Sequence, residues 1–398
     1  MNCESRVVQD RLSTHKPQLT THNSQSSSDA SMCTSMTSER PRVCGGLSPP
    51  VKPDASAGSD TAPDRLLAAR LFRQEAERQG FTRVGIARAG EPSRFDLFRS
   101  WVAGGMHAGM AYLERTLETR ASPDRVLPGA RSIVCLAAPH SGNPLIASDG
   151  ARIARYASGA DYHGTLRERT LRVARAVASR LRLPFRYRVC VDSTPLAERS
   201  FAAAAGLGWI GKNGCLIDAE CGSFLLLAEI LTDLDLPADE PVAERCGTCV
   251  RCLEACPTQA FSAPGLLDAS RCLAYWTIEH RGAIPDAVKE KLGPHVFGCD
   301  LCQEICPWNA PLLPAATERP PARREWLEMG PGQWRRRYGS TALNRAGRRG
   351  IQRNAAASGG SVRDPTLRPA LSGASRSTNA GLSDAVAWAS RRLPWADR

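Results

Sequence analysis

Eight cysteines within one short window constrain this chain more than any other feature of its sequence. The chain has 398 residues and 15 cysteines. One run reads C-x2-C-x2-C-x3-C-P and ends at Pro257; a lone cysteine follows, and a shorter run, C-x2-C-x3-C-P, ends at Pro307. In chain order the eight are Cys246, Cys249, Cys252, Cys256, Cys272, Cys299, Cys302 and Cys306.

This spacing is typical of the run that binds two [4Fe–4S] clusters in bacterial ferredoxins. There, three closely spaced cysteines bind one cluster, and the fourth, before the proline, binds the other. The second run is one ligand short, and Cys272 can supply it. The crossing rule therefore predicts two sets of ligands. Cluster one takes Cys246, Cys249, Cys252 and Cys306, and cluster two takes Cys256, Cys272, Cys299 and Cys302.

Zinc is the alternative metal for such cysteines, because C-x2-C pairs bind it in small domains. Zinc binding does not explain why both runs end in C-x3-C-P. Cysteines that are simply buried in a core would show no regular spacing. We interpret the window as a one-electron transfer unit, either complete in itself or serving another redox centre. The other seven cysteines show no ligand spacing: Cys3, Cys33, Cys44, Cys135, Cys190, Cys215 and Cys221.

No stretch of the chain approaches 18 consecutive apolar residues, so the sequence predicts no transmembrane helix. The first 30 residues are polar and lack the apolar segment of a secretory signal. We therefore expect a cytoplasmic protein that has no membrane contact. In a reducing compartment, 15 cysteines indicate metal binding or catalysis rather than disulfides.

Positive charge is concentrated at the C-terminal end. The formal net charge is +12, and residues 320–398 contribute +10 of it through 15 Arg against five acidic residues, with no Lys. Arginine binds phosphate in bidentate fashion and stacks on bases. This segment favours a nucleic-acid partner, although a solvated basic helical surface is the other interpretation.

Hydrophobic periodicity divides the chain into four parts. Residues 1–62 show no period and are predicted to be a disordered extension. Residues 63–240 alternate helices with strands, which is typical of an α/β or α+β domain. The cysteine window predicts a ferredoxin-like domain over 241–318, followed by an Arg-rich helical region over 319–398. Within the first domain we expect helices over 65–80 and 165–182, strands over 81–89, 131–140 and 186–193, and a buried apolar segment over 224–234.

A second motif, CVDSTPLAERSFAAAAGLGWIGKNGCLID, covers residues 190–218. Asp192 lies between a predicted strand and a predicted helix. It is therefore either a helix N-cap or an acid at the carboxyl end of a strand, where catalytic groups often lie. The glycine-rich loop that follows allows the backbone to approach a ligand closely. Lys212 in that loop either binds an anion or lies on the surface.

Two further strings have the mixed composition of ligand-lining loops. They are GMHAGMAYLERTLETRASPDRVLPGARS (105–132) and RIARYASGADYH (152–163). Each alone is weak evidence, because histidines such as His107 and His163 are more often surface or satisfied core residues than ligands.

Taken together, these strings resemble the epoxyqueuosine reductase family. The resemblance rests on five ordered strings over roughly 100–310, which include VDSTPLAERSFAAAAGLGWIGKNG, CGTCVRCLEACPTQAF and FGCDLCQEICPWN. It implies a cobalamin-binding α/β domain, a ferredoxin-like domain with two clusters and a short C-terminal segment of HEAT-like character. It also implies reduction of epoxyqueuosine to queuosine at the wobble position of a tRNA anticodon loop.

The resemblance also implies roles for single residues. Asp192 corresponds to the family's proposed proton donor, and Tyr156, His163 and Lys212 are expected with it at the cobalamin site. Because an acid must protonate the leaving oxygen, we expect the pKa of Asp192 to be raised by burial or by the ligand. The electron donor is unnamed, and we expect a monomer.

Two alternatives belong to other classes. A cobalamin-dependent reductive dehalogenase pairs cobalamin with two clusters, but that class usually carries a twin-arginine export signal and lacks a basic tail. A plain electron-transfer iron–sulfur protein would bind no cobalamin, and Asp192 would then be structural.

Overall fold

The computed structural model describes residues 61–140, 145–181, 183–309 and 319–393. The predicted disordered extension and its three cysteines therefore lie outside the described residues, apart from its last two positions. No helix within the described part of the chain is both long enough and apolar enough to cross a membrane.

A four-stranded sheet forms the centre of the N-terminal half, in the order β1-β2-β8-β5. Its strands are β1 (Arg83–Arg88), β2 (Ser132–Pro139), β5 (Tyr187–Cys190) and β8 (Leu225–Thr232). These confirm the predicted strands and show that the apolar segment 224–234 is a strand. Every neighbouring pair is antiparallel, so the sheet is of the α+β kind rather than doubly wound.

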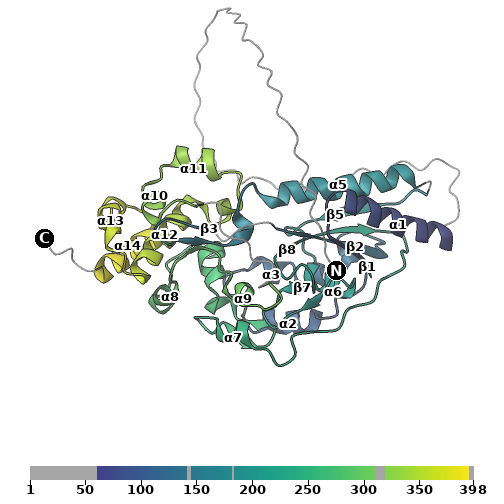
Figure 1. Cartoon of the computed structure of the whole chain (residues 1–398), viewed down its shortest axis with the longest axis horizontal. Coiled ribbons are helices and arrows are strands. Elements are labelled where there is room, and N and C mark those ends of the chain that lie inside the picture. Colours follow the sequence, from purple (N-terminus) through teal and green to yellow (C-terminus); the bar gives the residue numbers. More distant parts are fainter. Residues whose placement is uncertain (1–60, 141–144, 182, 310–318, 394–398) are drawn as a thin grey trace, which may run out of the picture. The chain divides into compact units, whose positions relative to one another are not determined.

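Helices cover both faces of this sheet. On one face α1 (Ala62–Arg78) packs beside α5 (Tyr162–Arg180), over a core that includes Phe72, Val173 and Ile230 (Figure 1). On the other face α6 (Glu198–Ala204) packs against β1, β2 and β8. Helix α1 ends before Gly80, whose φ of +77° suits glycine and closes the helix, as the sequence predicts. Shorter helices complete this half: α2 (Phe95–Ala103), α3 (Tyr112–Arg115) and α4 (Leu117–Ala121).

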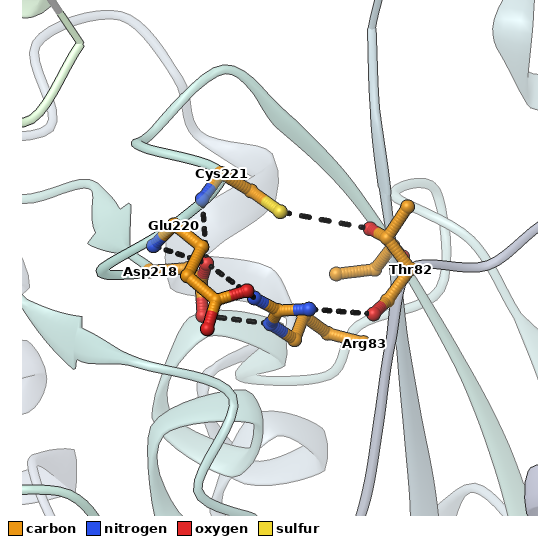
Figure 2. A network of polar contacts seen from close by, with 6 residues as sticks. Thr82, Arg83, Asp218, Glu220 and Cys221 are labelled. Carbon is orange, nitrogen blue, oxygen red and sulfur yellow. Dashed lines mark hydrogen bonds and ion pairs between the residues drawn. The ribbon is translucent and has the colours of Figure 1, made fainter. Parts of the chain in front are cut away.

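The glycine-rich motif folds as a small hairpin of β6 (Trp209–Ile210) and β7 (Leu216–Ile217). A polar network anchors its far end to β1 (Figure 2). The guanidinium of Arg83 donates to both oxygens of Asp218 at 2.9 and 3.2 Å, and the same carboxylate accepts the backbone N–H groups of Glu220 and Cys221. These charge-assisted bonds fix the hairpin, and with it the loop that carries Lys212.

The C-terminal region is helical, as the sequence predicts. The stretch SGGSVRDPTLRPALSGASRSTNAGLSD is rich in Gly, Ser and Arg, yet it contributes to three helices. Two of its four glycines, Gly359 and Gly360, lie where α12 packs closely on its neighbours. A Cβ on Gly359 would meet Leu367 at 2.1 Å, and one on Gly360 would meet Trp388 at 2.6 Å. The helices are α10 (Arg323–Glu328), α11 (Pro331–Tyr338), α12 (Gly347–Ser361), α13 (Arg368–Ala374) and α14 (Ala380–Arg392).

The arginines of α12 divide between interior and surface. Arg353 is 2% exposed and donates to the backbone carbonyls of Trp276, His280 and Gly282 at 2.7–2.9 Å. Its neighbour Asn354 is fully buried and donates to the carbonyls of residues 277 and 296. This part of the Arg-rich segment therefore holds the chain around the cysteine window and is not available to nucleic acid.

Packing crosses the sequence boundary predicted at residue 240. Residues 145–157 share a hydrophobic core with 273–297 and with the C-terminal helices. Strand β4 (Arg152–Ile153) pairs with β11 (His295–Phe297) and with β3 (Leu145–Ile146). The second of the two ligand-lining strings therefore lies between the sheet and the cysteine window. The window itself carries the remaining elements: α7 (Arg251–Glu254), β9 (Phe261–Ala263), β10 (Leu266–Leu267), α8 (Asp286–Lys291) and α9 (Leu301–Glu304).

Candidate functional site

The cysteines assigned to cluster one line a single cavity of about 350 Å³. Its wall includes all four of Cys246, Cys249, Cys252 and Cys306. Trp308 closes one side and packs edge to face on Trp209, with ring centroids 5.0 Å apart. The charged side chains of the lining are all basic: Lys212, Arg245 and Arg251. A negatively charged cluster with four thiolate ligands suits such a lining.

The cysteines assigned to cluster two also gather. The thiol of Cys299 interacts with those of Cys272 and Cys256, and the thiol of Cys302 with those of Cys299 and Cys272. Burial raises the pKa of Cys299 to about 12 and that of Cys302 well above its usual value. Thiols this deeply buried need a cation, such as cluster iron, before they can exist as thiolates.

The cavity favours a cluster. All four cysteines assigned to cluster one border a single space, as the ligands of one iron–sulfur cluster do. The donor set and the cavity together fit iron–sulfur clusters.

Cys215, which has no ligand spacing in the sequence, lies beside both groups. Its thiol interacts with those of Cys302, Cys306 and Cys252, and burial raises its pKa to about 11. Its position follows from the hairpin turn, where the Asn213 side chain accepts the Cys215 N–H and donates to the Cys302 carbonyl. Cys215 is therefore a natural control for any test of the ligand cysteines.

Asp192 follows β5, as the sequence predicts, and has the unusual φ of +48°. Aspartate tolerates this left-handed conformation better than most residues, and such strain often marks functional sites. Its Oδ2 lies 2.7 Å from Nε2 of His163. On the other side of the ring, Nδ1 of His163 lies 2.5 Å from Oδ1 of Asp161, the N-cap of α5. The imidazole is thus held between two carboxylates.

The charges of this group differ from the sequence expectation. The hydrogen bond from His163 holds the pKa of Asp192 below its usual range, although burial opposes this. The same bond raises the pKa of His163 to about 9, with Asp161 as a second cause. The expectation of a raised pKa at Asp192 is therefore wrong for this state. At neutral pH the proton lies on His163, and Asp192 is a carboxylate.

The segment RYASGADYH connects this acid–base group to the second group of cysteines. The Arg155 N–H donates to the side chain of Asp300, which lies between two cluster-two cysteines in the sequence. The Tyr156 ring contacts those of Phe297 and Tyr162, both at 6.0 Å. The Tyr162 ring stacks on His163 at 4.2 Å. Of the predicted cobalamin contacts, the structure therefore places Tyr156, His163 and Asp192 along one connected path.

Lys212 lies elsewhere. Its Nζ donates to the Gly247 carbonyl at 2.6 Å, and its side chain lines the cluster-one cavity. We therefore group it with cluster one rather than with Asp192. His107 is buried with its Nε2 3.0 Å from Glu114, which is a core role.

Sequence reasoning missed three ionisable groups near Asp192. Glu198 accepts the Asp192 N–H at 2.5 Å. Burial raises the pKa of Glu229, and Glu229 in turn helps to raise the pKa of the Cys135 thiol. Arg345 comes from the C-terminal region, pairs with Glu279 at 2.6 Å, and helps to lower the pKa of Asp192. Glu198 lies inside the recognised motif, but no sequence signal connects Arg345 with Asp192.

Two family models match the chain. One is described as "Epoxyqueuosine reductase QueG, DUF1730" and matches residues 120–193. The other is a 4Fe-4S double cluster binding domain and matches residues 245–309. The first covers His163 and Asp192, and the second covers all eight window cysteines.

Individual proteins are similar over much longer stretches. An epoxyqueuosine reductase of Xanthomonas campestris is 44% identical over 256 residues, which is 62% of this chain and 71% of that protein. A crystal structure of an epoxyqueuosine reductase with an epoxyqueuosine-modified tRNA-Tyr stem loop is 28% identical, with a TM-score of 0.70 over 80% of this chain and 88% of that one. A Bacillus subtilis epoxyqueuosine reductase, whose aspartate-bearing catalytic loop is swung out of the active site, matches with a TM-score of 0.73 at 28% identity and the same coverage.

Proposed function

The chain belongs to the epoxyqueuosine reductase family, and from this premise we propose how its residues perform the reaction. It is an oxidoreductase that reduces the epoxide of epoxyqueuosine in tRNA to give queuosine. The observation that carries the proposal is the series of contacts from Asp300, which lies between two cluster-two cysteines in the sequence, to the His163–Asp192 pair. That path brings an electron supply and a proton supply to one place.

We assign the two predicted sets of four cysteines to two [4Fe–4S] clusters, which carry electrons one at a time. Cobalamin would lie between cluster two and Asp192, in contact with Tyr156 and His163. When bound, it supplies a strongly reducing cobalt centre that can hold the two electrons the epoxide needs. The connected segment 155–163 supports this placement, because it reaches from Asp300 to Asp192.

The protein's own contribution is the proton. Loss of the epoxide oxygen as water consumes two electrons and two protons. His163 holds a proton at neutral pH and Asp192 accepts its hydrogen bond. The proton passes from Nε2 to Oδ2, and the carboxyl group formed in this way protonates the leaving oxygen. Asp161 keeps the imidazole oriented for this transfer. His163 therefore restores the acid form of Asp192.

A direct assay tests the function. The anaerobically reconstituted protein, supplied with cobalamin and a reductant, should convert epoxyqueuosine in tRNA to queuosine, seen as the loss of one oxygen in the mass of the digested nucleoside. If the protein neither binds cobalamin nor converts epoxyqueuosine, the proposed function is wrong, and the protein is a plain electron-transfer iron–sulfur protein. A reductive dehalogenase is not favoured, because the curated relatives are epoxyqueuosine reductases.

Replacement of His163 by Gln should change the pH profile as well as the rate. The raised pKa of His163 means that its pairing with Asp192 is complete below the usual value of 6.5 and is lost as pH rises through about 9. Wild-type turnover should therefore fall as pH passes about 9. The Gln variant should be slower at neutral pH and should lack this step. An unchanged step at pH 9 would exclude His163 as the proton source.

We propose that the C-terminal region, residues 319–398, is a short HEAT-like segment that contacts tRNA. Its helix α11 carries three exposed arginines in a row, Arg335, Arg336 and Arg337. An anticodon stem loop presents a phosphate backbone to such a surface, and a wobble base in a loop can be splayed into a pocket. We also propose that residues 63–240 form the cobalamin domain and residues 241–318 the cluster domain, and that the protein is a monomer.

Reversal of Arg335, Arg336 and Arg337 to Glu should weaken binding of the tRNA stem loop by about tenfold or more at low salt. The salt dependence of the binding constant should also become shallower, because fewer counterions are released. Binding measured over a series of salt concentrations checks both. Reversal of the exposed Arg70 and Arg175, on α1 and α5, is the matched control and should leave binding unchanged. Equal effects in both variants would remove α11 from the interface.

A further inference from the structure

One buried carboxyl group takes no part in the reaction as described so far. Glu229 lies in β8, an inner strand of the sheet, and is fully buried. Within the described residues, neither of its side-chain oxygens lies within ordinary hydrogen-bonding distance of a donor, and the polar side chain that interacts with it is that of another acid, Glu198. A buried carboxylate without a cation or donors is very unfavourable, so this group holds its proton.

The neighbours of Glu229 strengthen this conclusion. On the flanking strands β2 and β5 it is paired with Cys135 and Cys190, both buried thiols. From α6 and the loop before it, Glu198 and Asp192 raise its pKa further, after burial as the first cause. Every group that acts on its charge is thus a thiol or an acid. Glu229 is a neutral acid at the centre of the sheet.

Glu198 connects this acid to the catalytic loop. It begins α6, and its Oε1 accepts the backbone N–H of Asp192 at 2.5 Å. Burial and the Asp192 carboxylate raise the pKa of Glu198, whereas the hydrogen bond from the Asp192 N–H and the charges of Arg199 and Arg120 oppose this. Glu198 thus lies between Glu229, which keeps its proton, and the Asp192 carboxylate, which must gain a proton in every turnover. Two coupled acids of this kind hold protons as a pair.

The proton count of the reaction leaves a role for such a store. Conversion of the epoxide to an alkene and water consumes two protons, whereas the His163–Asp192 pair holds one. We propose that Glu198 and Glu229 hold the second proton and that Glu198 passes it to the Asp192 carboxylate. In this step the O–H bond of Glu198 breaks, an O–H bond forms on Asp192, and Glu198 becomes a carboxylate. The inference rests on the proposed function.

Glu198 is therefore a positioning residue that acts through Asp192. The variant Glu198→Gln removes the proton of Glu198 but keeps its hydrogen bond to the Asp192 N–H, so it tests the two roles separately. Glutamine keeps an oxygen that accepts the Asp192 N–H, but it holds no transferable proton. We expect the holoenzyme variant to bind tRNA with unchanged KM and to lose about tenfold or more in kcat. Its pH profile should lose the step that lies below the His163 step at about pH 9, while the His163 step remains.

Glu229→Gln is the second variant, and it decides the outcome if Glu198→Gln loses its clusters. It replaces a neutral acid by a neutral amide of the same shape, so thermal stability and iron content should match the wild type. Infrared spectra in H₂O and D₂O should show a protonated carboxyl band at neutral pH that this variant lacks. Its lower pH step should also move to lower pH, because Glu198 loses its coupled acid.

Three results would overturn the inference. One is a wild-type pH profile in both variants, another is a uniform loss of kcat at every pH, and the third is the absence of the carboxyl band. The infrared measurement needs no turnover, so it still tests the carboxyl pair if the wild type fails to convert epoxyqueuosine. Failure of the proposed function and failure of this inference are therefore separable.

Discussion

Replacement of Asp192 by Asn is expected to lower the turnover of epoxyqueuosine in tRNA by roughly 10²- to 10⁴-fold, the usual contribution of a general acid. Asparagine keeps the shape of aspartate and tolerates a φ of +48°, so the loop should keep its conformation. The Asp192 N–H can still donate to Glu198, whereas no proton can pass from His163 to the substrate. Single-turnover measurements on the loaded enzyme give the rate.

Iron content and cobalamin binding are the internal controls for this variant, and both should equal the wild type. Asp161→Asn is a graded comparison, because Asp161 only orients the imidazole and caps α5. Its loss of turnover should be smaller than that of Asp192→Asn. Turnover of Asp192→Asn within twofold of the wild type would remove Asp192 from the proton path and leave it as a structural residue.

Replacement of one ligand cysteine from each predicted set should remove about half of the iron. Cys306→Ala should lose cluster one, whose cavity it lines, and Cys272→Ala should lose cluster two. Either loss interrupts the single-electron path, so reduction of epoxyqueuosine should fall to background. Iron analysis with visible absorbance measures the loss, and electron paramagnetic resonance of the reduced protein identifies the remaining cluster.

Cys215→Ala is the matched control, because its thiol lies beside the same cysteines but has no place in the ligand spacing. It should retain all the iron and the activity. Iron loss in Cys215→Ala comparable with that in Cys272→Ala would mean that the crossing assignment is wrong and that Cys215 is a ligand. Circular dichroism separates loss of a cluster from loss of the fold.

The local pattern predicted most of the sheet and the position of Asp192. Apolar runs such as SIVCLAAP predicted their strands because a short continuous apolar run is typical of a strand buried on both faces. The pattern did not indicate strand direction, and all the pairings in this sheet proved antiparallel. Direction depends on which strands meet in three dimensions, and hydrophobicity along one strand carries no such information.

The charged groups show the same division. The sequence singled out Asp192 but predicted its pKa in the wrong direction, because that pKa depends on a hydrogen bond from His163, 29 residues away. It treated the C-terminal arginines as one basic surface, whereas Arg353 is buried and holds backbone carbonyls. The residue type gives the charge of a side chain. Only packing in the folded chain decides whether that side chain contacts solvent, pairs with a carboxylate or is buried in the interior.

The sequence by itself determined the cysteine chemistry. Three of the four ligands of cluster one lie within seven residues, and the two C-x3-C-P endings predict which cysteine crosses to which set. The tertiary structure alone decided what surrounds Asp192. It brought His163 from α5, Glu229 from β8 and Arg345 from the C-terminal region to one loop, over separations of 29 to 153 residues. Proton positions depend on such long-range neighbours, because burial and nearby charge set each pKa, and both exist only in the folded chain.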